Sequence, residues 1–260
     1  MRKIIDIAAL SIAVCILVMV LFLPSPVLSF KCYRGDGVSC AKLGRDKLSR
    51  GDYEGARLAF IRACKAGEKD SCFDLGALYD GEGNATQAGV FYAAACDKNV
   101  AIACHKLGNL YQRGRLGRDF VAAAQRYIKA CDLGYAKSCH NAAVVYFTGG
   151  FGLAADLAKA VSFFERGCDG GLVDSCYNAG VAYDKGLGAP QDRDKAEKLY
   201  TKSCELGYGD ACNNLGYLYV SKGDLRGFSK GLGCVKKGCD AGNKKSCQLY
   251  EFMKEQILKK

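Results

Sequence analysis

The chain is poor in the side chains that most often hold metal ions or mark a catalytic site. Its 260 residues include only two histidines, His105 and His140. Zinc ligands usually stand two to four residues apart, whereas fourteen of the sixteen cysteines stand in pairs eight apart. These features disfavour a metal site, and the sequence indicates no cofactor.

A nucleic-acid-binding motif is also absent, although the formal net charge is +10. Much of that charge is at the end of the chain, because residues 221–260 hold ten lysines or arginines against four acidic residues. We interpret this basic end as a solvated capping face. Contact with acidic surfaces or lipid head groups is the alternative.

Cysteine is abundant instead, and its positions repeat. The pairs recur every 32 to 37 residues, which indicates an array of repeated units. Residues eight apart in a continuous helix are about 12 Å apart, too far for a disulfide, so the chain must reverse within each pair. Glycine, or in one unit Asn99, stands three residues after each first cysteine and suits such a turn. The pairs are Cys32/Cys40, Cys64/Cys72, Cys96/Cys104, Cys131/Cys139, Cys168/Cys176, Cys204/Cys212 and Cys239/Cys247.

Helices are predicted on both sides of each turn. Before the first cysteine, an alanine, an aromatic residue and the cysteine recur at intervals of four, as in Ala196, Tyr200 and Cys204. Four residues before each alanine is a residue that suits a helix start, namely Asp52, Asn84, Asp119, Asp156 or Asp192. A second stripe follows the second cysteine and in most units carries a mid-helix glycine, which indicates close packing. The pattern predicts six helix pairs in residues 30–246 and a capping helix over residues 247–260.

The first residues differ from the rest of the chain. Arg2 and Lys3 precede an apolar run, and Val27 and Ser29 suit cleavage before Phe30. We interpret residues 1–29 as a secretory signal peptide, with an uncleaved membrane anchor as the alternative; Cys15 lies within this segment. A secreted or periplasmic location makes disulfides the expected state of the paired cysteines, and metal binding the alternative.

A family resemblance follows from these motifs. The segment 176–183, Cys-Tyr-Asn-Ala-Gly-Val-Ala-Tyr, and its continuation to Ala196 resemble a Sel1-like repeat, a relative of the tetratricopeptide repeat. With a cysteine pair in every unit, residues 32–260 are similar to the Helicobacter cysteine-rich protein family. The last unit departs from the pattern at Gly227, Gly231 and Val235. The expected fold is an all-α, right-handed α/α solenoid of six disulfide-stapled Sel1-like helix pairs plus the capping helix.

The resemblance also implies an activity that the residues do not support. The family has been assigned penicillin binding and slow β-lactam hydrolysis, which would make the chain a β-lactamase linked to antibiotic resistance. Ser39-Cys-Ala-Lys42 matches the motif Ser-x-x-Lys, yet it overlaps a cysteine pair, and its Ser-Asp-Asn and Lys-Thr-Gly companions are absent. We interpret the match as coincidence. Catalytic residues therefore stay unassigned, and whether the chain is an enzyme stays open.

Three other side chains have structural interpretations. His105 and His140 follow second cysteines, at a place that other units fill with varied residues. We expect a structural or surface role for them. Cys234 has no partner eight residues away, and its counterparts in other units are mostly apolar. A buried core thiol is favoured over an intermolecular or reactive one.

The candidate ligand-binding residues are three amides in successive units. Asn141, Asn178 and Asn214 each stand two residues after a second cysteine. Equivalent positions align in a solenoid, so these amides could hold an extended peptide; bonding to the neighbouring helix is the alternative. The first hypothesis is a secreted scaffold for a peptide or protein partner, of host or cell-envelope origin. The alternative is a binder of β-lactams or peptidoglycan fragments with slow hydrolysis. Neither involves nucleic acid, and anchoring in a membrane would require the N-terminal segment to remain uncleaved.

Overall fold

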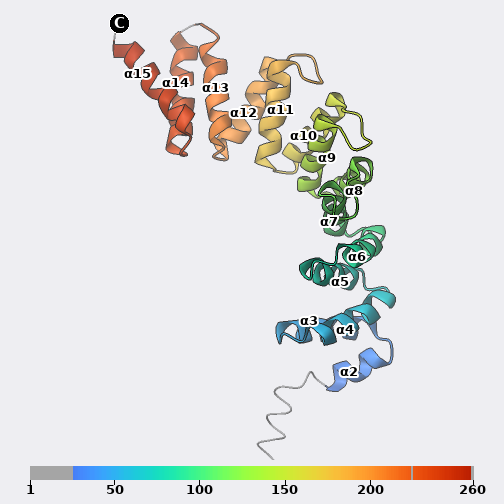
Figure 1. Ribbon diagram of the computed structural model, residues 1–260. Helices are drawn as coiled ribbons and strands as arrows, with labels where there is room; N and C mark the ends of the chain where they lie inside the picture. The colour runs from blue at the N-terminus through green and yellow to red at the C-terminus, as the bar shows by residue number, and fades with distance from the viewer. Residues whose placement is uncertain (1–25, 224, 259–260) are drawn as a thin grey trace, which may run out of the picture. The chain divides into compact units, whose positions relative to one another are not determined.

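The computed structural model describes residues 26–223 and 225–258. These residues fold into fourteen helices and contain no strand; one isolated bridge joins Gly150 and Leu153. The helices follow one another along the chain (Figure 1). They are α2 (Pro26–Tyr33), α3 (Gly37–Ser49), α4 (Tyr53–Lys65), α5 (Lys69–Gly81), α6 (Ala85–Asp97), α7 (Ala101–Gln112), α8 (Phe120–Asp132), α9 (Ala136–Thr148), α10 (Leu157–Asp169), α11 (Val173–Lys185), α12 (Arg193–Glu205), α13 (Gly209–Val220), α14 (Leu225–Asp240) and α15 (Lys244–Leu258).

The chain divides into two compact units. The described part of the first holds α2 to α6 and the first turn of α7, and the second begins at Cys104 and continues through α15. The predicted all-α solenoid is confirmed, with six helix pairs from α3/α4 to α13/α14. The short helix α2, which carries Cys32, is an element that the repeat pattern did not predict.

The predicted helix caps are confirmed in the structure. Each cap side chain accepts a hydrogen bond from the backbone N–H three residues later. This bond satisfies one of the N–H groups that a helix start leaves unpaired. The capping pairs are Asp52 with Gly55, Asn84 with Gln87, Asp119 with Ala122, Asp156 with Lys159 and Asp192 with Lys195.

The turns within the cysteine pairs also follow the prediction. Gly67 has φ of +105° and Asn99 has φ of +62°, so both adopt the left-handed conformation that ends a helix. Glu68 N–H donates to the carbonyl of Ala63, which closes the turn at 3.0 Å. The chain reverses there and brings the two cysteines of a pair together.

Disulfides join the cysteines in the pairs that the spacing predicts. Six of the bonds have Cα separations of 4.4 to 4.7 Å, within the range that a disulfide can close. Cys96 and Cys104 are disulfide-bonded as well. The six measured bonds are Cys32–Cys40, Cys64–Cys72, Cys131–Cys139, Cys168–Cys176, Cys204–Cys212 and Cys239–Cys247.

In four of the bonds, the sulfur of the second cysteine lies close to a backbone carbonyl oxygen. The sulfurs of Cys40, Cys72 and Cys212 lie 3.3, 3.8 and 3.5 Å from the carbonyl oxygens of their own bonded partners. The sulfur of Cys139 lies instead 4.0 Å from the carbonyl oxygen of Tyr135, at the start of its own helix. A sulfur in a disulfide carries no hydrogen, so these are packing contacts and not hydrogen bonds. Sequence spacing missed them because they depend on how the turn folds the second cysteine back against a helix end.

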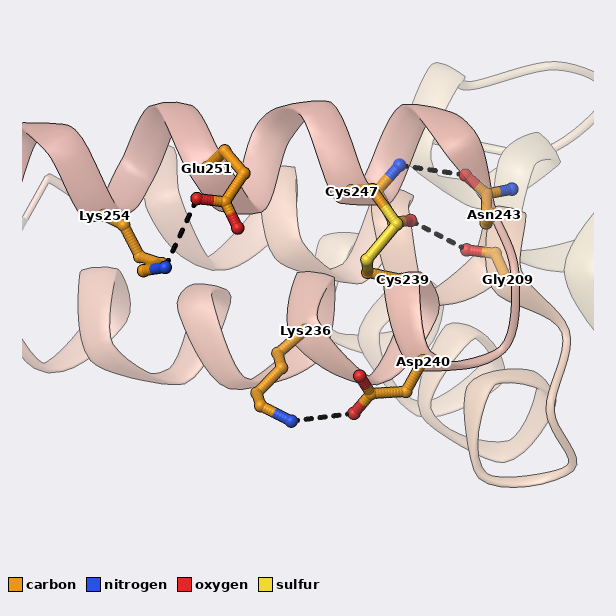
Figure 2. Close-up of a disulfide and its surroundings, with 9 residues drawn as sticks. Gly209, Lys236, Cys239, Asp240, Asn243, Cys247, Glu251 and Lys254 are labelled. Atoms are coloured by element: carbon orange, nitrogen blue, oxygen red, sulfur yellow. Dashed lines mark hydrogen bonds and ion pairs between the residues drawn. A yellow bond between two sulfur atoms is a disulfide. The ribbon is translucent and has the colours of Figure 1, made fainter.

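The last disulfide joins α14 to the capping helix α15. Figure 2 shows Cys239 and Cys247 across the turn, where Cys247 N–H donates to the carbonyl of Asn243 at 3.1 Å. Lys236 and Asp240, which lie on either side of Cys239 in the sequence, form an ion pair at the end of α14 (Figure 2). This helix boundary therefore has a covalent link and local polar contacts.

Mid-helix glycines mark the closest helix contacts. A Cβ atom on Gly76 would lie 2.6 Å from a ring carbon of Tyr92, and one on Gly180 would lie 2.8 Å from a ring carbon of Tyr200. No larger residue fits either place without displacing a buried ring. The last pair keeps this close contact in another way, because a Cβ on Gly231 would lie 2.9 Å from the carbonyl oxygen of Gly216. The final unit is thus still a regular helix pair, in which a glycine replaces the expected alanine.

Most of the predicted signal segment, including Cys15, lies outside the described residues, and its end belongs to α2. Within residues 26–223 and 225–258, no helix combines the length and apolar character that membrane crossing requires.

Candidate functional site

The three candidate amides occupy the same place on α9, α11 and α13. Asn141, Asn178 and Asn214 each lie in the first half of their helix, and each is half-buried. All three belong to the second unit. Their surroundings, however, differ in one respect that decides what each side chain can do.

Asn141 and Asn214 are hydrogen-bonded inside the protein. Asn141 Nδ2 donates to Asn109 Oδ1 at 3.4 Å, and the Tyr127 hydroxyl lies 2.7 Å from that same oxygen. Burial raises the pKa of Tyr127 to about 12, although its hydrogen bond with Asn141 acts in the opposite direction. Asn214 Nδ2 donates to the Tyr200 hydroxyl at 3.3 Å. These two amides fasten neighbouring helices to each other, as the structural alternative expected.

Asn178 has no such partner. The residue fourteen positions before it is Phe164, in the place that Tyr127 and Tyr200 hold relative to Asn141 and Asn214. A phenyl ring offers no hydroxyl, and no side chain in the described part of the chain hydrogen-bonds the Asn178 amide. The amide of Asn178 therefore retains its capacity to donate and to accept.

Asn178 lines an apolar pocket of about 210 Å³. The pocket lies between α9, α10 and α11 and the loop after α11. A free amide surrounded by apolar walls is typical of a ligand site, where a few polar groups orient the ligand. The other lining residues are Val144, Phe147, Ala160, Val161, Phe164, Val181, Ala182 and Leu187.

A second pocket, of about 340 Å³, lies one repeat further on and includes Asn214. It lies between α11 and α13 and the start of α12. Its character is polar, because Lys185, Arg193 and Ser221 contribute to it beside Tyr217 and Leu218. The two pockets follow the same repeat geometry and differ in chemistry.

The two histidine rings are half-buried and pack against neighbouring helices. Their Nδ1 atoms lie 2.8 Å (His105) and 3.0 Å (His140) from the hydroxyls of Ser138 and Ser175. Burial lowers the pKa of His105 to about 4, and it lowers the pKa of His140 as well. Each ring also contacts the aromatic residue of the repeat, His105 on Tyr127 and His140 on Phe164.

The sequence pattern did not reveal that this position, directly after the second cysteine, carries a ring. Phe73 and Tyr177 take the same place and contact Tyr92 and Tyr200 in the same way. Four units thus place a ring where the sequence showed only unrelated residue types. The shared property is a flat side chain, which could have been read from these four residues.

The remaining candidates have structural surroundings. The Ser39 hydroxyl donates to Asp36 inside a disulfide loop, while Lys42 is exposed. Cys234 is free and half-buried, packed against the core of α12 and α13, and burial raises its pKa. In the described residues, no group of three or more histidine, cysteine, aspartate or glutamate side chains could hold a metal ion.

Comparisons with known proteins agree on one family. The model of the Sel1 repeat matches residues 101–135, 136–172, 173–208 and 209–243, which together exceed half of the chain. No curated protein matches the chain in sequence.

Solved structures add a fold comparison. A Sel1 repeat protein from Oxalobacter formigenes is 24% identical over 81% of this chain and 86% of its own, with a TM-score of 0.61. A protective antigen of uropathogenic Escherichia coli is 22% identical over 88% of this chain and 58% of its own, with a TM-score of 0.49. Helicobacter pylori cysteine rich protein B is 27% identical over 49% of this chain and 91% of its own, with a TM-score of 0.39.

Proposed function

The chain belongs to the Sel1 repeat family, and we propose that it is an exported scaffold that binds a peptide or an extended segment of a protein partner along α9, α11 and α13. The observation that carries this proposal is Asn178, whose unpartnered amide lines an apolar pocket. The partner would be of host or cell-envelope origin.

Peptide chemistry fits the side chains around Asn178. An amide side chain can donate to a backbone carbonyl and accept from a backbone N–H at the same time. The apolar walls exclude water and strengthen such hydrogen bonds. The neighbouring Asn214 lies at the equivalent place in the next repeat, so an extended chain could follow the repeats from one pocket to the next.

Substitution of the amides tests this function. Asn178→Ala should weaken peptide binding by about 1 to 2 kcal/mol, the scale of a lost hydrogen bond and its unpaired partner. The melting temperature should hardly change, because Asn178 has no hydrogen-bond partner among the described side chains. The matched control is Asn141→Ala, which should lower the melting temperature because it removes the contact with Asn109.

Binding itself can be measured as thermal stabilisation of the purified chain, since a ligand of the folded state raises stability by mass action. The arms are a library of short peptides with free C-termini and a penicillin. Stabilisation by peptides that disappears in Asn178→Ala supports the proposal. Stabilisation by penicillin alone, with turnover of a chromogenic cephalosporin, would instead favour the β-lactam alternative.

Export is the second part of the proposal. Seven disulfides indicate an oxidising environment, and this supports a secreted or periplasmic location. N-terminal sequencing of protein recovered outside the cytoplasm should begin at or near Phe30, within α2. Recovery of the full-length chain from the membrane fraction would contradict cleavage and support an anchor.

A further inference from the structure

We propose, building on the peptide-binding function above, that the ligand is an extended peptide that places an apolar side chain in the Asn178 pocket and a carboxylate in the pocket of Asn214. The carboxylate would be an acidic side chain or the C-terminus of the ligand. The two groups would stand about three residues apart. This inference concerns which peptides bind, and it rests on the different linings of the two pockets.

The pocket of Asn178 suits an aliphatic or aromatic side chain. Among the described residues that line it, Asn178 alone is polar, and the others are aliphatic or phenyl groups. Two of them, Phe147 and Leu187, are 48% and 37% exposed, so apolar surface at the pocket lacks a cover. An apolar side chain of the ligand would remove that surface from water, which is favourable in proportion to the area covered.

The pocket of Asn214 suits a carboxylate. Its charged lining residues are Asp184, Lys185 and Arg193. Asp184 is already paired with Lys185 at 3.1 Å, and its side chain is only 17% exposed. Arg193 is exposed and forms no ion pair with any described residue, which leaves a net positive charge with a guanidinium free to bind. Arginine binds carboxylates through two parallel hydrogen bonds.

The helix α11 sets the distance between the two pockets. Val181 and Ala182 contribute to the first pocket, and Asp184 and Lys185 contribute to the second. Packed helices lie about 8 to 10 Å apart, and an extended chain advances about 3.3 Å per residue. The two recognised groups should therefore be separated by about three residues.

Labelled hexapeptides of glycine and alanine with one leucine and one glutamate provide the probe, measured by fluorescence anisotropy. One series carries C-terminal amides, and a second replaces glutamate with glutamine and keeps a free C-terminal carboxylate. We expect the tightest binding when leucine and carboxylate are three residues apart. Replacing leucine with glycine should weaken binding about tenfold or more, and removing the carboxylate should weaken it about tenfold. The series that binds more tightly identifies whether the recognised carboxylate is the glutamate side chain or the C-terminus.

Charge reversal provides the matching protein variant. Arg193→Glu should weaken binding of the glutamate peptide and improve binding of the same peptide with lysine in place of glutamate. Lys69→Glu, an exposed position in the first unit with the same change in net charge, is the control and should alter neither. Both variants should keep the melting temperature of the parent chain, because each changes an exposed side chain.

The results separate this inference from the function on which it rests. One outcome is peptide binding that depends on Asn178 but does not weaken when leucine or the carboxylate is removed. That outcome would overturn the inference and leave the proposed function intact. An unchanged preference in Arg193→Glu would also overturn it. If no peptide of either series binds, the proposed function fails together with this inference.

Discussion

The α10–α11 boundary and the α12–α13 boundary differ by one oxygen atom at the ring that faces the amide, which is Phe164 in the first and Tyr200 in the second. Both have a capping aspartate, a left-handed glycine and a disulfide at the same places. In the later repeat the ring is Tyr200, whose hydroxyl accepts from Asn214. In the earlier one it is Phe164, and Asn178 has no partner among the described residues. A single hydroxyl therefore decides whether the amide joins two helices or stays free for a ligand.

The first unit contains a related case. Phe60 is fully buried, and the polar residue fourteen positions later is Asp74. Without a hydroxyl beside it, Asp74 forms an ion pair with Arg45 at 3.7 Å, and burial raises its pKa. A phenylalanine at this place again removes the hydroxyl that would otherwise be the hydrogen-bond partner of the polar side chain.

The largest expected effect comes from breaking a disulfide in each of the two repeats. One double variant combines Cys168→Ser and Cys176→Ser, and the other combines Cys204→Ser and Cys212→Ser. Each double substitution opens a loop of the same length, so each should lower the free energy of unfolding by about 2 to 3 kcal/mol. Urea denaturation measures this loss, and the fold should survive because solenoid stability is shared between neighbours. Unequal losses would show that the Asn214–Tyr200 bond, rather than loop length, governs local stability.

An exchange of the hydroxyl should have the next largest effect. Phe164→Tyr should give Asn178 a partner, raise the free energy of unfolding by about 0.5 to 1.5 kcal/mol, and weaken peptide binding. Tyr200→Phe should lower the free energy of unfolding and leave the Asn214 amide without its hydrogen bond to the ring. Thermal denaturation and peptide titration measure both. Unchanged peptide affinity in Phe164→Tyr, with increased stability, would show that the Asn178 amide does not contact the ligand.

A third expected effect is a dependence of stability on pH. The pKa of His105 is lowered to about 4 by burial, with smaller contributions from Lys106, Lys137 and Arg113. The unfolded chain, with a histidine pKa near 6.5, then binds more protons than the folded chain between about pH 6.5 and 4. Stability should therefore be full above pH 6.5 and fall as the pH drops through that interval.

His105→Phe should flatten this dependence, because Phe73 shows that a phenyl ring is accepted at the same place in another repeat. His140→Phe is the companion variant. The pKa of His140 is lowered as well, but Asp174 opposes the effect of burial, so its substitution should flatten the curve less. Melting temperatures from pH 7 to pH 4 provide the measurement, and equal slopes in all three proteins would contradict the assignment.

The fold could be predicted because its determinants are local. Asp192 caps a helix four residues before Ala196, and Gly207 turns the chain three residues after Cys204, so each signal stands beside the structure that it specifies. The repetition of these signals in one unit after another identifies the architecture. Helix α2 escaped prediction because its short segment carries only part of the pattern.

The site could be predicted only in part. Sequence spacing found Asn141, Asn178 and Asn214, but it treated them as equivalent. Their difference depends on a residue of the preceding helix, and a phenylalanine and a tyrosine satisfy the same apolar pattern. The signal was nevertheless present, because Phe164 interrupts the tyrosines at 127 and 200. Only the packing of the rings against the amides gives that interruption a chemical meaning.

The regular disulfides also determine how the chain would behave under tension. Each bond joins residues eight apart, so a pulling force applied to the ends cannot extend the residues enclosed between them. Extended chain contributes about 3.3 to 3.6 Å per residue, and every enclosed loop withholds its share of that length. Reduction would release these lengths one bond at a time, so the maximum extension of the chain reports its redox state.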